Sequence, residues 1–334
     1  MIGTNYMKKS RSSKSKNKKY VLLGIASVII IGIIVSYTSG SQDNTSDLQS
    51  PLLGSWMDIH GVGMFLSGTD DTLYLATHNG LFKKESDRWK LVGNDKSDLM
   101  GFSISSKEGI MYSSGHPSAM NGNLGFRIST DNGNSWTMIS KVKDNPVDFH
   151  AMTASKALNG LVYGSPGGGS ELFVSLDEGT SWRSLTPPDR IVSLAADPLN
   201  SDRVYAGTIS GLYVSDDKGQ QWQKIISDAE LGTITGIGFV MDGKTMYLFS
   251  SLDGKGVIYK SITGGEIMVK TQGQITNTGA VFNFAPGRNG EIYATAMERV
   301  SSGTASSIYM TNDGGDTWIL EGTNNSELAL TKNT

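Results

Sequence analysis

The sequence predicts an all-β protein made of repeated four-stranded units, a six-bladed β-propeller. Two observations predict this fold. The turn pattern Ser/Thr-x-Asp-x-Gly-x-x-Trp returns along the chain at the blade-like period of about 40–50 residues, and each interval holds several short apolar segments. The composition agrees, because 41 of the 334 residues are glycine, 8 are proline and only 18% are charged. Such a mixture favours many short strands joined by tight turns.

The turn pattern occurs four times in near-perfect form, at 129–136, 175–182, 215–222 and 311–318. In each copy we expect the Asp side chain to accept backbone N–H bonds, and the Gly to supply a backbone angle that other residues reach only with strain. The Trp ring is expected to lie between neighbouring sheets. The residues in these structural roles are Asp131, Gly133, Trp136, Asp177, Gly179, Trp182, Asp217, Gly219, Trp222, Asp313, Gly315 and Trp318.

Two weaker copies complete the series. At 261–268, Thr263 replaces the Asp and Met268 replaces the Trp, and a shortened copy ends at Trp89. The six copies predict six four-stranded units, near 58–93, 98–141, 148–186, 190–226, 233–271 and 279–322. A seventh unit built from both termini stays open, and the strand around Leu52–Trp56 could instead close the ring.

The N-terminal region differs from the rest of the chain. Residues 20–37 form an uncharged apolar run of 18 residues, and basic residues crowd the segment before it. A membrane-spanning helix needs about 17–25 residues, and positive charge stays on the cytoplasmic side. We therefore expect a single-pass cell-membrane protein: cytoplasmic tail 1–19, signal-anchor helix 20–37, flexible linker 38–51, extracytoplasmic propeller 52–325 and C-terminal tail 326–334. The alternative is a cleaved signal peptide, although no A-x-A-like site follows the run.

The charge balance and the lack of cysteine exclude several classes of function. Seven of the 29 basic residues precede the first acidic residue, which leaves 22 basic against 32 acidic residues and a net charge of −10 for the remainder. A nucleic-acid partner is not expected, because phosphate binding requires a basic surface. With no cysteine, the chain has neither a disulfide framework nor a thiolate metal site.

The four histidines fall at equivalent places in the first three predicted blades. His60 and His150 lie at the starts of first strands, whereas His78 and His116 end second strands. In a propeller these positions share one face, opposite the turns that carry the repeated pattern. Met100 takes the place of His60 and His150 in the second blade.

Two interpretations of this histidine face stay open. The histidines could be polar groups that satisfy loop ends near the channel, or they could form a metal or acid–base site. Histidine nitrogen with Met100 sulfur would suit copper, whereas the histidines with Asp58, Asp98 or Asp148 would suit zinc or another divalent ion.

The repeated turn resembles the Asp-box (BNR) repeat, which also occurs in sialidases, sortilin-type receptors and photosystem assembly-factor propellers. The phrases DIHG, LYLATHNGLF, DLMGF, SGHP, NLGFRISTDNGNSW and DFHA, together with the wider stretch of about residues 55–320, resemble a bacterial family of exported Asp-box propellers labelled glycosylhydrolase-like. The resemblance implies the fold and an extracellular or membrane-bound location. The family label implies a glycosidase, although fold analogy is a weak basis for activity.

The residues themselves leave catalysis open. A sialidase needs three arginines, a Tyr–Glu pair and an Asp, and this set is not evident; Arg127 runs directly into a repeated turn. Another glycosidase would need two carboxylates about 5–9.5 Å apart, for which Asp58, Asp98 and Asp148 are the candidates. Two hypotheses therefore stand: a non-catalytic recognition or assembly propeller with a protein or glycan ligand and a metal-binding face, or a glycoside hydrolase.

Overall fold

The computed structural model describes residues 52–331, except 68–69, 87, 119–121, 228–230, 254 and 276–277. The predicted cytoplasmic tail, membrane helix and linker lie outside the described residues. Among the residues that are described, no helix is both long and apolar enough to cross a membrane.

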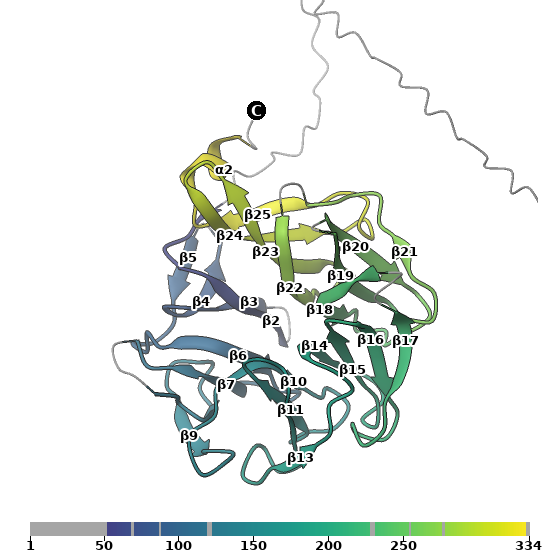
Figure 1. The fold of residues 1–334 in the computed structure, drawn as a ribbon. Coiled ribbons are helices and arrows are strands. Elements are labelled where there is room, and N and C mark those ends of the chain that lie inside the picture. The colour runs from purple at the N-terminus through teal and green to yellow at the C-terminus, as the bar shows by residue number, and fades with distance from the viewer. Residues whose placement is uncertain are drawn as a thin grey trace, which may run out of the picture. The chain divides into compact units, whose positions relative to one another are not determined.

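Six antiparallel sheets of four sequential strands are arranged around a central axis, as the sequence predicts (Figure 1). Blade 1 contains β2 (Ile59–Ser67), β3 (Asp70–Thr77), β4 (Gly80–Glu85) and β5 (Arg88–Leu91). Blade 2 contains β6 (Asp98–Ile104), β7 (Met111–His116), β8 (Phe126–Ser129) and β9 (Thr137–Ser140). Blade 3 contains β10 (Phe149–Ala154), β11 (Val162–Pro166), β12 (Leu172–Ser175) and β13 (Arg183–Leu185).

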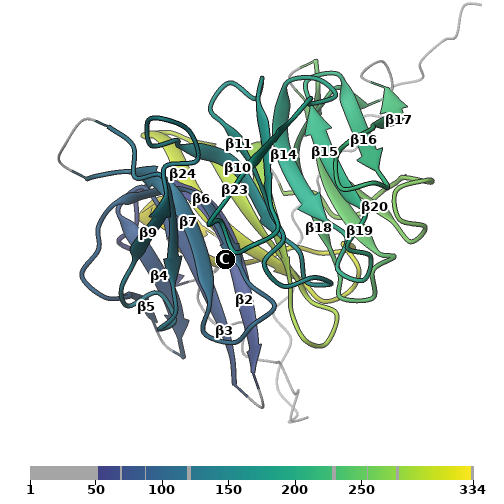
Figure 2. The ribbon, with the colours of Figure 1, turned by 90° about the horizontal axis from the view of Figure 1, so that it is seen from below.

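Blade 4 contains β14 (Ile191–Ala196), β15 (Val204–Thr208), β16 (Gly211–Ser215) and β17 (Gln223–Ser227). Blade 5 contains β18 (Thr233–Phe239), β19 (Met246–Leu252), β20 (Lys255–Ser261) and β21 (Val269–Lys270). Blade 6 contains β22 (Thr278–Pro286), β23 (Ile292–Val300), β24 (Gly303–Thr311) and β25 (Ile319–Thr323). The first strand of each blade is innermost, and each contacts the first strand of the next blade (Figures 1 and 2). The ring closes where β22 contacts β2.

The N-terminal strand strengthens this closure and rules out a seventh blade in the described chain. β1 (Leu52–Leu53) pairs in parallel with β25, so it forms a fifth strand of blade 6. Just beyond it, the Trp56 indole donates a hydrogen bond to the Ser306 carbonyl at 3.1 Å. The segment assigned to the C-terminal tail holds a short helix, α2 (Ser326–Thr331).

The core consists of six apolar clusters, and each joins two neighbouring blades. Between blades 2 and 3, for example, Tyr112 and Phe126 pack with Phe149 and Phe173. The first strands supply branched and aromatic side chains, and five of the six second strands supply a buried tyrosine. Adjacent blades are therefore held together by buried apolar area, at about 25 cal/mol per Å².

The four near-perfect copies of the repeated turn share one hydrogen-bond pattern. In the turn of blade 3, the Ser175 hydroxyl accepts the Gly179 N–H at 2.8 Å, and the Asp177 carboxylate accepts the Ser181 N–H at 2.9 Å. Hydrogen bonds from Ser181 hold the pKa of Asp177 below its ordinary value. In the weaker copy of blade 5 the Thr263 hydroxyl accepts the Ile267 N–H at 3.0 Å. Threonine thus retains one of the hydrogen bonds that the aspartate accepts in the other copies.

The glycine and the tryptophan of each near-perfect turn pack against the preceding blade. Gly179 has a φ of +84°, and a Cβ there would lie 2.0 Å from the Phe126 ring of blade 2. Trp182 packs on the same ring with centroids 5.0 Å apart, and its indole donates to the Ser140 hydroxyl at 2.9 Å. The turn is thus a contact between blades as well as a closure of its own hairpin.

Gly179→Ala should destabilise the protein by about 3 kcal/mol or more, because the left-handed backbone costs about 1–2 kcal/mol and the clash with Phe126 adds to it. The matched control is Gly290→Ala: Gly290 has a similar φ of +92° but has no atom within 4 Å of the added methyl group. Urea unfolding of both variants checks this. Equal losses in the two variants would contradict the interblade role of Gly179.

Arg127, the arginine that runs directly into the first near-perfect turn, is a buried residue of blade 2. Its guanidinium pairs with the Asp95 carboxylate at 2.7 Å and lies 5.4 Å from the centre of the Trp136 ring. Burial lowers the pKa of Arg127, and the Asp95 charge opposes this shift. The residue therefore stabilises the blade and does not face the channel.

Asp95→Ala should cost about 3 kcal/mol of unfolding free energy, because it leaves a buried guanidinium without its counter-charge. Glu171→Ala removes the partner of Lys143 in an exposed pair and should cost less than about 1 kcal/mol. Chemical denaturation of the two variants compares them directly, and similar small losses would show that the Asp95 pair is not important for stability.

Candidate functional site

Each first strand carries a β-bulge near its start, and histidines occupy two of these bulges. The pairing register shifts between Ile59 and Gly61 in blade 1 and between Phe149 and Ala151 in blade 3. His60 and His150 are the extra residues. A bulge turns a side chain away from the regular alternation of a strand, and bulges are common beside functional sites. The sequence alone did not indicate these bulges.

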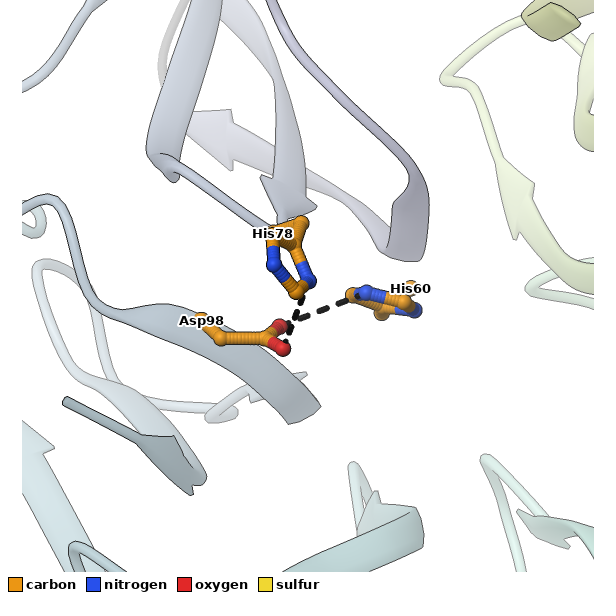
Figure 3. Close-up of side chains that lie close together, drawn as sticks. All are labelled: His60, His78 and Asp98. Atoms are coloured by element: carbon orange, nitrogen blue, oxygen red, sulfur yellow. Dashed lines mark ion pairs between the residues drawn. The ribbon is translucent and has the colours of Figure 1, made fainter. Parts of the chain in front are cut away.

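The first histidine group, called site A, consists of His60, His78 and Asp98 (Figure 3). His78 follows β3 of the same blade, and Asp98 begins β6 of the next blade. His78 Nδ1 lies 2.8 Å from Asp98 Oδ2, and His60 Nε2 lies 3.3 Å from Asp98 Oδ1. Both imidazoles therefore converge on one carboxylate, although the Asp98 side chain is only 7% exposed.

The second group, called site B, consists of His116, Asp148 and His150. His116 ends β7 of blade 2, whereas Asp148 and His150 lie at the start of the first strand of blade 3. His116 Nε2 and His150 Nε2 lie 2.9 and 2.8 Å from Asp148 Oδ2. The Asp148 side chain is 8% exposed. Site B is thus a second set of two imidazoles around one buried carboxylate.

The two sites repeat one arrangement across neighbouring blade boundaries. In each, a histidine at the end of a second strand meets an aspartate at the start of the next blade's first strand. The third member differs: site A takes its bulge histidine from the earlier blade, and site B takes it from the later one. The D-x-H spacing at 58–60 and 148–150 in the sequence marks the bulge histidines, but it does not show that the partners come from different blades.

Blade 2 links the sites, because Asp98 of site A and His116 of site B are register partners in the β6–β7 ladder. Directly opposed residues of an antiparallel pair lie about 4.5–5.5 Å apart at Cα. The charges are coupled as well. Desolvation by burial raises the pKa of Asp98, but His60, His78 and His116 oppose it, and the net pKa is lowered. The hydrogen bond to Asp148 raises the pKa of His150, and Asp98 adds to this effect.

Unpaired buried atoms show what the two sites lack. Asp148 Oδ1 is buried and has no hydrogen-bond partner among the described residues, and Asp98 Oδ1 and His60 Nε2 are buried and face each other at 3.3 Å without the geometry of a hydrogen bond. An unsatisfied buried polar atom costs about 1–3 kcal/mol. Within each site the ligand atoms of all three residues lie within 4.8 Å of one another. A cation could therefore satisfy these atoms with little rearrangement, and the donor set of two nitrogens and one oxygen fits a divalent transition metal.

The other candidates of the sequence lie near these sites but outside them. The Asp58 carboxylate is exposed and accepts a hydrogen bond from the Ser306 hydroxyl of blade 6 at 3.4 Å. Its backbone carbonyl accepts the His78 N–H at 2.9 Å. Met100 lies in neither histidine group and lines the central cavity. The structure thus brings Asp98 and Asp148 to the histidines and leaves Asp58 apart from both sites.

A central cavity of about 430 Å³ opens beside sites A and B. His60 and His150 line it, together with Met100 and Arg190. A separate recess on the outer side of site B is lined by His116, Asp148 and His150. Each site can therefore be reached from the central cavity, through a bulge histidine.

No protein-family model matches this chain, and no curated protein matches it. The similar solved structures include an ancestral GH74 enzyme, with a TM-score of 0.54 and 18% identity over 81% of this chain. They also include the extracellular domain of BT4673 from B. thetaiotaomicron, described as a one-component system, with a TM-score of 0.50 and 14% identity over 79% of this chain. A structure of YCF48 bound to D1 peptide matches with a TM-score of 0.49 and 16% identity, over 84% of each chain.

The chain spans 39% of the GH74 enzyme and 33% of the BT4673 structure. At these identities the likeness establishes the fold alone, and the chain is similar to other β-propeller proteins.

Proposed function

We propose that this chain is a membrane-tethered, extracytoplasmic recognition or assembly propeller that binds divalent metal ions at sites A and B. One observation carries the proposal: two sets of two histidines and one aspartate occupy consecutive blade boundaries. Asp148 Oδ1 of site B is buried without a hydrogen-bond partner, and Asp98 Oδ1 of site A meets His60 Nε2 at 3.3 Å without hydrogen-bond geometry. A histidine that only satisfied a loop end would not require a second imidazole on the same carboxylate.

Zinc, or a divalent ion with similar ligand preferences, fits the donor sets better than Cu(I). Each site offers two imidazole nitrogens and one carboxylate oxygen. Soft sulfur ligands favour Cu(I), whereas mixed nitrogen and oxygen ligands are typical of zinc. Asp98 and Asp148 would each bind through one carboxylate oxygen, with the histidines completing each set. Three protein ligands leave a coordination position free for a ligand, as recognition requires.

A recognition role is better supported than glycoside hydrolysis. A glycosidase acid must hold its proton near neutral pH, which requires a raised pKa. The histidines instead lower the pKa of Asp98, and the carboxylates of both Asp98 and Asp148 are largely buried in contact with imidazoles. The similarity to a GH74 enzyme is one of sheet architecture, and it assigns no catalytic residue to this chain.

Membership of the exported Asp-box family is part of the proposal. The shared hydrogen bonds of the turns at 129–136, 175–182, 215–222 and 311–318 support it, since serine or threonine, aspartate and glycine take the same roles in each. The histidine-bearing phrases that make up the resemblance hold all six residues of sites A and B, which favours a shared binding role.

The full-length chain, purified with detergent and without a histidine tag, should bind about two zinc ions per molecule by elemental analysis. His60→Ala should reduce this to about one, and His60→Ala with His150→Ala should abolish stoichiometric binding, because each substitution removes one of only three ligands. Asp58→Ala is the matched control, since Asp58 occupies the blade position of Asp98 and Asp148 but lies outside both sites. Unchanged zinc content in the double variant would refute the assignment.

Membrane tethering by residues 20–37 predicts that the chain stays with the membrane pellet after alkaline carbonate extraction. Replacing Ile30 and Ile31 by Asp should release it or block its export, because charges at the centre of a membrane helix cost several kcal/mol. Accessibility of the propeller to protease added outside intact cells gives its side of the membrane. Recovery of the unsubstituted chain in the carbonate-soluble fraction would contradict a retained anchor and favour a cleaved signal peptide.

A further inference from the structure

The central cavity is lined by both ionisable and apolar side chains, and the metal sites account for only some of them. The bulge histidines His60 of blade 1 and His150 of blade 3 line it, and so does Arg190 of blade 4. Much of the remaining lining is apolar and comes from the inner strands, including Met100, Phe102 and Met152. Methionine side chains adapt to different apolar shapes. A ligand that fills this space must combine an apolar body with a group that suits the histidines and the arginine.

Arg190 is the cationic part of this wall. It directly precedes β14, at the place in blade 4 where blades 2 and 3 carry Asp98 and Asp148. Its Nε donates to the Gly168 carbonyl at 3.2 Å, which holds the guanidinium beside the cavity. Among the described residues it forms no ion pair within 4 Å, whereas Arg127, Arg203 and Arg288 each do. The guanidinium therefore keeps donors for a planar anion.

We propose that the central cavity binds a small carboxylate ligand with an apolar body, such as an acylated amino acid or the C-terminus of a short peptide. This inference rests on the proposed metal sites for part of its affinity. The carboxylate would bind Arg190 of blade 4 and the free coordination position of an ion held at site B, whose His150 lies on the neighbouring blade 3 and lines the same cavity. The apolar body packs against the methionine and phenylalanine side chains.

The size and charge of the cavity favour this class over others. A volume of about 430 Å³ falls within the usual range of roughly 300–1,000 Å³ for small-molecule sites, and most such sites combine apolar walls with a few placed polar groups. A glycan would bring many hydroxyl groups and leave them unpaired against an apolar lining. A phosphate ester would need more cationic groups than the single arginine on this wall.

The test uses calorimetric titration of the zinc-loaded, full-length chain with N-acetyl-L-phenylalanine and with its neutral C-terminal amide. The acid should bind at least about tenfold more tightly than the amide, since charge-assisted hydrogen bonds are lost with the carboxylate. Arg190→Gln should remove this preference while the zinc content stays the same. Arg183→Gln is the matched control, because Arg183 begins the outer strand β13 and does not line the cavity.

Each outcome bears on one proposal. Equal binding of acid and amide, no binding of either, or an Arg190→Gln variant that keeps the preference would overturn the carboxylate site. Inorganic phosphate that competes as well as the acid would also overturn it. Zinc is measured in every sample. Two bound zinc ions without binding of the acid would refute the carboxylate site and leave the metal sites standing. Acid binding that depends on Arg190 in a protein that takes up no zinc supports the cavity and refutes the metal proposal.

Discussion

The structure depends above all on the contact that each near-perfect copy of the repeated turn makes with the preceding blade. A four-stranded antiparallel sheet cannot bury both of its faces alone, so the blades are stable only when they pack against one another. The turn glycines approach side chains of the preceding blade so closely that a methyl group would overlap them: Gly133 meets Leu81, Gly179 meets Phe126 and Gly219 meets Leu185. The tryptophan that follows covers the same boundary. Successive copies of one local motif thus set the spacing of the blades.

That regular spacing also creates the histidine face. Every blade has the same order and direction of strands. The start of a first strand therefore always lies near the end of the preceding blade's second strand, on the face opposite the turns. Aspartates and histidines placed at these two positions meet across the boundary without any special loop. The bulge in each first strand then adds a third side chain to the group. A metal site built in this way relies on the rigid scaffold of the sheets, which favours precise positioning of its ligands.

Much of this arrangement could be predicted from the sequence, and the reason is the repetition. The six copies of the turn, from the one ending at Trp89 to the one at 311–318, predicted six blades and their limits, and the observed strands begin and end close to the predicted units. The open question of a seventh blade was answered only by the pairing of β1 with β25. The position of each histidine within its repeat was also enough to group the four histidines on one face.

Prediction was weaker where one blade meets another, because pairing across blades depends on three-dimensional spacing that no local pattern encodes. Asp58, Asp98 and Asp148 looked equivalent, yet only the last two have a histidine on the preceding blade. The bulges at His60 and His150, and the addition of β1 to blade 6, likewise arise from register and closure.

The central claim is that sites A and B are metal sites, and anomalous X-ray scattering from a zinc-soaked crystal tests it most directly. The account predicts two peaks at the zinc absorption edge, one bounded by His60, His78 and Asp98 and the other by His116, Asp148 and His150, with metal–ligand distances of about 2.0–2.2 Å. Direct imidazole–carboxylate hydrogen bonds at both places, with no anomalous density between the rings at saturating zinc, would contradict it.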